Sequence, residues 1–201
     1  MKKFILPFLV SLALAPLAWA NDFTFAQAGL KIDLPLGFAL LPRADIDLLY
    51  APTRGPSFVI GNAARSVTVS YDLKLNDIST LNLAQGLKTF ERVFEQRVPA
   101  LAWKERKVIE QEKQQWLQLE FQSKAGGADY YNIMLITPLK DQMLVLNFSS
   151  SLAEFDKAQP QLRAVIKSIA LNVVTPQLVV APAPASPKKT APVKKKEKAA
   201  P

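Results

Sequence analysis

The chain of 201 residues contains neither cysteine nor histidine. Without cysteine it cannot form a disulfide, a thiolate metal site or the lipidated cysteine of a lipoprotein. Without histidine it also lacks the commonest general base and the imidazole ligand of zinc, copper and haem sites. These absences exclude most hydrolase mechanisms and leave carboxylate-pair chemistry, a Ser-Lys dyad or an oxygen-only metal site. No cofactor motif is present, so no cofactor is predicted.

The first twenty residues have the pattern of a cleavable secretory signal. Two lysines follow the initial methionine, an apolar segment covers 4–14, and Ala18-Trp19-Ala20 places small residues at the two positions that a signal peptidase reads. Cleavage would leave Asn21 at the new N-terminus. The alternative is an uncleaved membrane anchor, but the apolar run is shorter than the roughly 20 residues that a span needs. The pattern therefore predicts export to the bacterial periplasm, with secretion as the second choice.

The net charge of +8 is concentrated at the two ends of the chain. The two N-terminal lysines contribute +2 and the last fourteen residues contribute +5, so the body between them carries only +1. A nearly neutral body in an exported protein argues against nucleic acid as a partner. The sequence also shows no stop-transfer segment, so no transmembrane span is expected after cleavage.

From residue 176 to residue 201 the composition changes to proline, alanine, valine and lysine. The segment has no aromatic residue and no helical or strand period, so it cannot bury enough apolar surface to offset its ordering entropy. We expect a disordered tail that contacts anionic envelope surfaces, either lipid headgroups, lipopolysaccharide or peptidoglycan, or an envelope protein. The alternative is that the tail only solubilises the protein. Its basic residues are Lys188, Lys189, Lys194, Lys195, Lys196 and Lys198.

Residues 21–175 have the length of a single globular domain. Apolar and polar residues alternate along 66–73, which predicts a strand with one covered face. Two shorter strands are indicated by 30–34, which leads into a turn, and by 58–61. Short connections then predict an antiparallel meander. Its first strand is heavily charged and is expected at a sheet edge, and its last is apolar on both faces and is expected at the centre. The four strands are 103–111, 115–123, 129–137 and 142–149.

Two helices have clear patterns. Asn82 can cap the first, apolar residues then recur at steps of three or four, and Pro99 ends it. The second is predicted to begin with Ser151 as its cap and to bury a stripe over 155–169. Pro160 is expected to kink or split this helix. Together with the strands, this order predicts an α/β (α+β) sandwich in which a mainly antiparallel sheet carries helices on its faces.

Several local sequence patterns follow one another along the chain in an order that is typical of one known fold. They are Gly29-Leu30-Lys31-Ile32-Asp33-Leu34-Pro35-Leu36-Gly37-Phe38, the strand ending in Tyr71, the helix from Leu81 to Phe94, the Gly126-Gly127 hairpin, Asn147-Phe148-Ser149-Ser150 and the closing Ile166-Lys167-Ser168-Ile169. In this order the chain resembles the PsbP-like fold superfamily, and within it the bacterial envelope proteins of the DcrB type. The resemblance implies an α/β/α sandwich used for binding or for assisting an assembly, with no shared chemistry. DcrB-type proteins are usually lipid-anchored, and this chain departs from them because it has no cysteine.

The candidate sites for chemistry are weak. Asp45 and Asp47 are a pair of carboxylates separated by a single residue. They could bind calcium, but we expect them to lie at the start of a solvent-exposed helix, where acids favour the positive end of the helix dipole. Ser149-Ser150-Ser151 is expected to cap a helix, because no Gly-x-Ser-x-Gly motif surrounds it. The meander's aromatic residues are expected in the core or at a sheet edge, with an exposed stacking pair as the alternative. They are Trp103, Trp116, Tyr130 and Tyr131. No catalytic, cofactor-binding or metal-binding residue is predicted.

These observations predict a non-catalytic periplasmic binding or accessory protein of the bacterial envelope, with the basic tail as its contact to anionic surfaces. Two alternatives stay open. One is a carboxylate-dependent hydrolase acting on envelope glycans, which requires two carboxylates within about 10 Å in one cleft. The other is a structural or chaperone-like component of the envelope.

Overall fold

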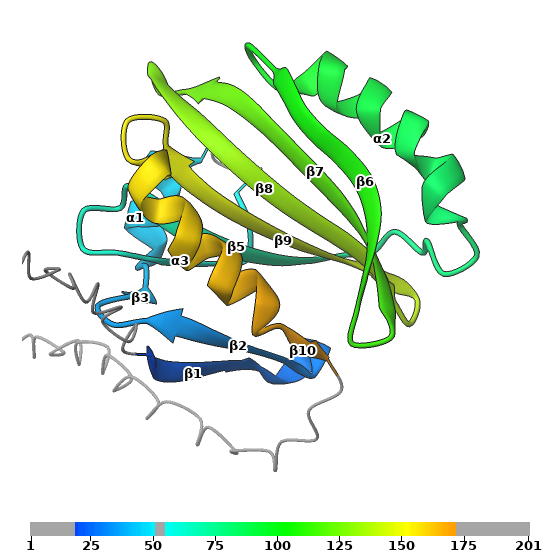
Figure 1. Ribbon diagram of the computed structural model, residues 1–201, viewed down its shortest axis with the longest axis horizontal. Helices are drawn as coiled ribbons and strands as arrows, with labels where there is room; N and C mark the ends of the chain where they lie inside the picture. The colour runs from blue at the N-terminus through cyan, green and yellow to red at the C-terminus, as the bar shows by residue number, and fades with distance from the viewer. Residues whose placement is uncertain (1–18, 51–54, 172–201) are drawn as a thin grey trace, which may run out of the picture.

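The computed structural model describes residues 19–50 and 55–171. Its strands form two antiparallel sheets, one of seven strands in the order β3-β4-β5-β9-β8-β7-β6 and one of three in the order β1-β2-β10 (Figure 1). In chain order the elements are β1 (Trp19–Phe25), the short 3₁₀ helix η1 (Ala26–Ala28), β2 (Leu30–Pro35), β3 (Ala39–Leu40), α1 (Arg43–Leu49), β4 (Phe58–Gly61), β5 (Val67–Lys74), α2 (Leu83–Arg97), β6 (Ala102–Gln111), β7 (Gln114–Ala125), β8 (Ala128–Leu139), β9 (Gln142–Ser151), α3 (Phe155–Lys167) and β10 (Ala170–Leu171).

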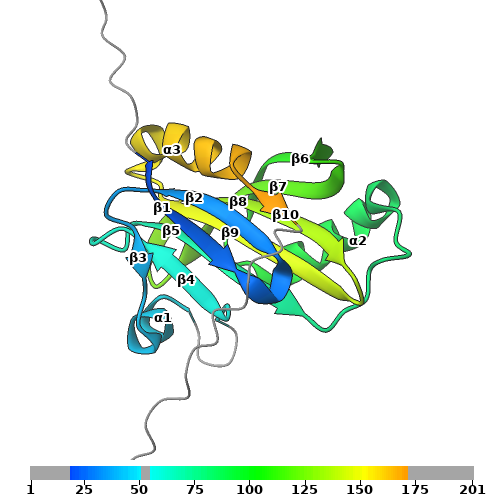
Figure 2. The ribbon, with the colours of Figure 1, turned by 90° about the horizontal axis from the view of Figure 1, so that it is seen from below.

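The two faces of the large sheet are covered very differently (Figures 1 and 2). On one face, which we name the closed face, α3 and the small sheet pack against the central strands and enclose the main core. On the opposite face, which we name the open face, α2 packs over β6 and β7. The predicted sandwich, with a mainly antiparallel sheet and helices on its faces, is confirmed.

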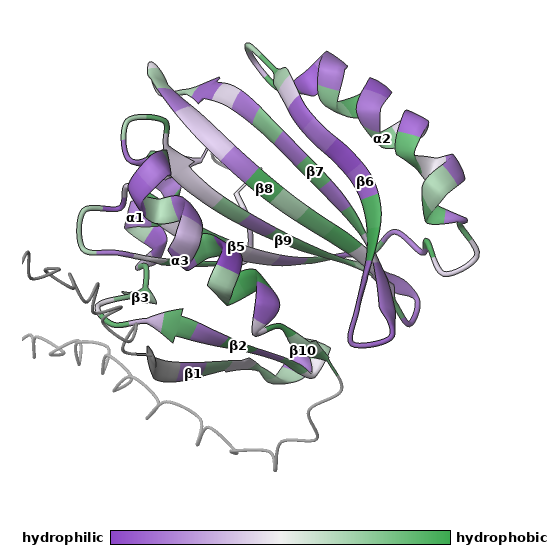
Figure 3. Ribbon diagram, viewed as in Figure 1, coloured by the Kyte–Doolittle hydropathy of each residue, from purple (hydrophilic) through white to green (hydrophobic). Residues whose placement is uncertain are grey.

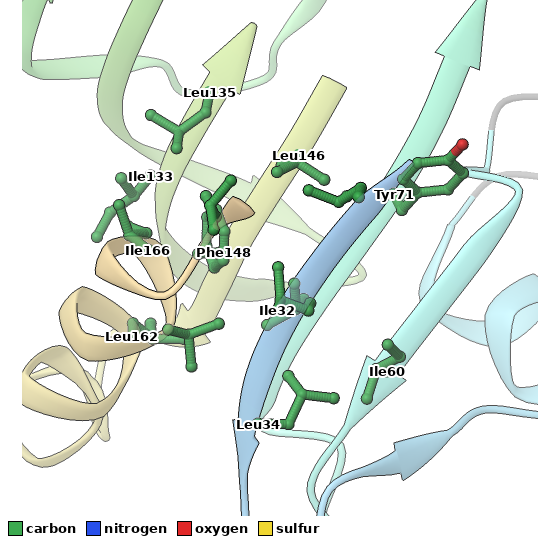
Figure 4. Packing of buried hydrophobic residues seen from close by; sticks show 14 of the residues in the cluster. Ile32, Leu34, Ile60, Tyr71, Ile133, Leu135, Leu146, Phe148, Leu162 and Ile166 are labelled. Carbon is green, nitrogen blue, oxygen red and sulfur yellow. The ribbon is translucent and has the colours of Figure 1, made fainter. Parts of the chain in front are cut away.

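The main core lies on the closed face, where aliphatic side chains from three layers meet. Ile32 of the small sheet, Leu146 of the large sheet and Leu162 of α3 are almost completely buried there (Figure 4). Burying a side chain of this size contributes about 1.5–3 kcal/mol. This packing fixes the large sheet as a rigid floor beneath the open face.

The predicted meander is confirmed, and its strands are longer than expected. The charged strand β6 lies at the sheet edge, where Figure 3 shows it as largely hydrophilic, and β9 is central. Two of the hairpins turn through pairs of residues with positive φ, Glu112 and Lys113 in one and Gly126 and Gly127 in the other. Such pairs form the turn whose twist matches that of the flanking strands.

The strand predicted at 66–73 is β5, but the expectation of a single covered face was wrong. Its polar residues Thr68, Ser70 and Asp72 are buried as well as its apolar ones. The cover comes from outside the sheet, because Ser57 donates a hydrogen bond to the Asp72 carboxylate at 2.8 Å and Tyr50 lies beside Thr68 and Ser70. The polar face of β5 is therefore the floor of an enclosed region of the open face.

The first predicted helix is confirmed as α2. The Asn82 side chain accepts a hydrogen bond from the backbone N–H of Gln85 at 3.2 Å, as a cap does, and the helix ends before Pro99.

The predicted start of the second helix at Ser151 was wrong. Ser151 is the last residue of β9, paired with Tyr130, and α3 begins only at Phe155. Pairing along β8 thus extends the strand through the serines that looked like a cap. Pro160 lies inside α3 without splitting it, since it removes only one intrahelical hydrogen-bond donor.

The strands predicted at 30–34 and 58–61 are confirmed as β2 and β4. The predicted cleavage point after Ala20 falls within β1, and residues 21–25 of that strand pair with β2. The rest of the predicted signal, and the tail with its six lysines, lie outside the described residues. Within 19–50 and 55–171, no helix combines the length and hydropathy that crossing a membrane requires.

Candidate functional site

The side chains of the open face change from apolar to polar along the strands. The change on β8 is offset by one residue pair from the change on β9, because Ile136 is paired with Val145, Met134 with Asn147 and Asn132 with Ser149. From the apolar end to the polar end, the residues on this face are Ile136, Met134, Asn132 and Tyr130 on β8, and Met143, Val145, Asn147 and Ser149 on β9. The open face therefore has an apolar half beside α2 and a polar half beside α1.

The polar half contains a hollow of about 140 Å³, which we name the polar cleft. Its floor is the large sheet and one wall is the end of α1. The lining residues are Leu49, Tyr50, Arg65, Ser66, Thr68, Ser123, Ala125, Tyr130, Asn132, Asn147 and Ser149. Hydroxyl and amide groups dominate this lining, and no carboxylate belongs to it.

A ladder of side-chain amides crosses the floor of the polar cleft. The Asn147 Nδ2 donates to the Asn132 Oδ1 at 3.2 Å, and the Asn132 Nδ2 donates to the Ser123 Oγ at 2.9 Å. The Asn147 Oδ1 is itself buried and has no hydrogen-bond partner among the described residues. A buried acceptor without a partner costs about 1–3 kcal/mol, so a hydroxyl or N–H of a ligand would recover that free energy.

The walls of the cleft supply further hydrogen-bonding groups. Burial raises the pKa of Tyr50, and the neighbouring hydroxyls of Thr68 and Ser70 only partly oppose this, so the phenol is neutral at physiological pH. Arg65 is paired with Asp45 at 2.8 Å. A similar pair joins Asp47 to Arg43 at 2.8 Å. The expectation of two acids at an exposed helix start is confirmed only in part: both lie in α1, but only Asp45 is in its first turn, and the Asp45 side chain is only 18% exposed.

The apolar half of the open face contains a second hollow of about 510 Å³, which we name the apolar groove. It lies between α2 and strands β8 and β9. Its lining residues are Lys74, Asn76, Ile78, Phe90, Val93, Phe94, Arg97, Met134, Ile136, Met143 and Val145. The two methionines are unbranched and adapt readily to the shape of an apolar guest.

Two acids do lie close together, but on the closed face. Glu105 and Glu120 are cross-strand neighbours, and the Gln118 Nε2 donates to both, at 3.2 and 2.5 Å. Arg163 of α3 donates to both carboxylate oxygens of Glu120, at 2.6 and 2.7 Å. The Tyr131 hydroxyl also donates to the Glu120 carboxylate, at 2.9 Å. Neither acid lines the polar cleft or the apolar groove, so the arrangement gives no support to the glycan hydrolase.

The titration of this group fits a structural role. Burial raises the pKa of Glu120, but the hydrogen bonds and positive charge of Arg163, with the Tyr131 hydrogen bond, outweigh it and leave the pKa below its usual range. Burial, with the hydrogen bond to Glu120, raises the pKa of Tyr131 to about 12. Glu120 is therefore an ionised, fully bonded carboxylate that fastens α3 to the sheet.

The predicted packing of the meander's aromatic residues is confirmed for three of the four. Trp116 is buried in the main core, Trp103 packs with Phe94 and Phe121 beside α2, and Tyr131 stacks on Phe155 with ring centroids 3.6 Å apart. The exception is Tyr130, which lines the polar cleft.

The serine run at 149–151 does not cap a helix as predicted, because it forms the end of β9. Ser149 instead lies in the polar cleft. Sequence reasoning missed this site, although Asn132 and Asn147 carried a signal: each is a polar residue in a strand that is otherwise largely apolar. Within 19–50 and 55–171, no three acidic side chains converge as a metal site would require.

Comparison with known proteins gives structural matches only. No protein-family model matches the sequence, and no curated protein matches it. The fold is similar to the cyanobacterial PsbP (CyanoP) of Synechocystis sp. PCC 6803, with a TM-score of 0.51, 13% identity, and coverage of 81% of this chain and 98% of that one.

Two further solved structures are similar. One is LpqN, involved in cell envelope biogenesis of Mycobacterium tuberculosis, with a TM-score of 0.51, 12% identity, and coverage of 75% of this chain and 89% of that one. The other is a protein from Bacteroides thetaiotaomicron, with a TM-score of 0.50, 12% identity, and coverage of 77% and 49%. The likeness to DcrB-type proteins in particular stays a prediction. The chain has a PsbP-like fold, as its sequence predicted.

Proposed function

We propose that this chain is a non-catalytic binding protein of the bacterial envelope and that the polar cleft holds its ligand. The observation that carries the proposal is the amide ladder on the floor of the polar cleft, in which the Oδ1 of Asn147 is buried and has no partner among the described residues. Hydrogen-bonding groups orient a ligand but do not transform it when no carboxylate lines the cleft with them. The ligand therefore carries hydroxyl or N–H groups that pair with the ladder.

The envelope setting rests on two supports. The first is the signal-like segment at the N-terminus, which predicts export. The second is the shared fold with LpqN, a protein involved in cell envelope biogenesis.

The test for the cleft follows the side-chain amide signals of Asn132 and Asn147 by NMR in the mature chain. Soluble glycan and polar lipid fractions from bacterial envelopes are titrated in turn. We expect at least one fraction to shift both signals, Asn147→Ala to abolish the response, and the control Gln122→Ala to preserve it. Gln122 is an amide on β7 of the same sheet that lines neither the polar cleft nor the apolar groove. If no fraction shifts the signals, or if Asn147→Ala responds normally, the cleft is not the binding site.

We further propose that the basic tail holds the protein at an anionic envelope surface. A lysine near such a surface contributes about 1 kcal/mol, and six lysines contribute less than the sum, so the attachment is weak and sensitive to salt. The mature chain and a chain ending at Thr175 are compared for retention on isolated envelopes. We expect only the longer chain to be retained at low salt and to be released at high salt. Equal retention of the two chains would remove this role from the tail.

A further inference from the structure

The polar cleft and the apolar groove are neighbouring parts of one surface. On β8, Asn132 of the cleft is two residues from Met134 of the groove, and on β9 the same spacing separates Asn147 from Val145. Two residues along a strand span about 7 Å, and both side chains point to the same face. The two hollows are therefore close enough along one face for a single ligand to reach both.

The groove is suited to a chain of methylene groups. Its volume of about 510 Å³ lies within the range of roughly 300–1,000 Å³ typical of ligand pockets. Phe90, Met143 and Val145 lie along its floor and wall, and Val93 on α2 is 38% exposed within its lining. Each buried methylene contributes about 0.8 kcal/mol, so even a partly buried acyl chain would dominate the affinity.

The charge of the combined surface favours one negative charge on the ligand. Three basic residues and no acidic residue line the two hollows. Lys74 is paired with Asp72, and Arg65 is paired with Asp45. The remaining cation, Arg97, has no ion-pair partner among the described residues.

Arg97 also lies at the end of the apolar groove that is nearer the polar half of the sheet. It is in the last turn of α2, and the connection that follows is held beside the polar half of the sheet, because Lys124 donates its backbone N–H to the Pro99 carbonyl at 3.0 Å. The guanidinium group suits a phosphate oxygen, to which it can donate two parallel hydrogen bonds.

We propose that the ligand is a lipid whose acyl chain lies in the apolar groove and whose headgroup, bearing hydroxyls and a single negative charge, lies in the polar cleft near Arg97. This inference rests on the proposed function and specifies the class of ligand. Hydroxyl groups pair with the amide ladder, the phosphodiester pairs with Arg97, and the chain follows α2. A headgroup alone leaves the apolar groove empty, and a lipid with a zwitterionic headgroup brings no net negative charge to Arg97.

The probe is 1-myristoyl-lysophosphatidylglycerol, titrated below its micellar concentration into the mature chain and followed by calorimetry. Two comparison ligands separate the contributions: lysophosphatidylcholine with the same chain, and glycerol 3-phosphate, which has no chain. We expect the phosphatidylglycerol probe to bind at least about tenfold more tightly than the choline lipid, because one desolvated ion pair distinguishes them. We expect glycerol 3-phosphate to bind at least about 100-fold more weakly, because the methylene contribution is lost.

Matched variants locate the binding. Val93→Ser should weaken binding of both lysolipids, whereas Leu152→Ser should not, although Leu152 is exposed to nearly the same extent, 40% against 38%. Arg97→Gln should remove the preference for the glycerol headgroup, whereas Arg92→Gln, on the same helix but outside both linings, should preserve it. All four positions are exposed, so the variants should fold, which circular dichroism verifies.

The outcomes separate this inference from the function on which it rests. Absence of binding, equal affinity for the two lysolipids, or equal effects of Val93→Ser and Leu152→Ser would overturn the lipid assignment. The function would survive if an envelope fraction still shifted the Asn132 and Asn147 signals. If the lysolipids do not bind and no envelope fraction shifts the two amide signals, both proposals are rejected.

Discussion

Removing Arg163 should destabilise the protein more than removing any exposed arginine, because its partner is buried. The Glu120 side chain is only 2% exposed, and Arg163, at 34%, is the cation that binds both of its oxygens. Breaking a buried ion pair costs about 3–5 kcal/mol, and the partial exposure of the arginine favours the lower end. The Tyr131 hydroxyl and the Gln118 amide stay in place and limit the loss. We expect Arg163→Met to lower the free energy of unfolding by about 3 kcal/mol.

Urea denaturation at pH 7 measures this loss, and a thermal melt should show a decrease in Tm of about 6–12 °C. The matched control is Arg43→Met, which breaks the pair with Asp47, whose side chains are 58% and 43% exposed. Such an exposed pair is worth less than about 1 kcal/mol. If the two variants lose the same stability, Glu120 is not held as described.

The loss should also depend on pH. Burial raises the pKa of Glu120, but the Arg163 hydrogen bonds and charge outweigh this effect, so the folded-state pKa lies below the ordinary value of 4.5. The stabilisation is therefore complete above that value and disappears as the pH falls through the folded-state pKa. In Arg163→Met, burial still raises the pKa of Glu120 but no cation lowers it, so the ionised carboxylate contributes less to the stability of the folded state. The stability gap between native protein and variant should widen between pH 3.5 and pH 7, and a constant gap would contradict the mechanism.

Two further predictions concern local structure. Asn82→Ala should lower the free energy of unfolding by about 1 kcal/mol, because the Gln85 N–H loses its cap; urea denaturation measures this, and an unchanged midpoint would contradict it. Gly127→Ala should cost about 1–2 kcal/mol although nothing lies within 4 Å of the added methyl group, because φ is +82° there; a destabilised hairpin seen by amide hydrogen exchange checks it, and unchanged protection would refute it.

The elements that the sequence predicted well are those whose signals are local. In β6 to β9 the turn residues stand next to the strands they join, and in α2 the Asn82 cap and the apolar period agree. The short strands β3 and β10 could not be predicted, because two residues carry no period. They form because the backbone N–H and C=O groups along one edge of β4 pair with β3, and those along one edge of β2 pair with β10. The small sheet was missed because β1 begins inside the segment interpreted as a signal and β10 has only two residues.

The candidate site was predictable only in fragments. Asn132 and Asn147 could be recognised as polar residues in otherwise apolar strands, but their contact depends on the β8–β9 register, which the sequence does not display. The Glu120–Arg163 pair joins residues 43 positions apart on different layers, and no local rule connects them. Charge patterns reveal an edge strand readily, whereas they do not reveal a buried ion pair.

The position of the last described strand has a consequence for orientation. Leu171 pairs with Leu30 in the small sheet, which packs on the closed face of the large sheet. Leu171, the last described residue, thus lies on the closed-face side of the molecule, and the large sheet separates it from both hollows. If the proposed attachment occurs through the segment that follows Leu171, the ligand site and the point where that segment begins lie on opposite faces of the large sheet, so the two contacts need not compete for one face.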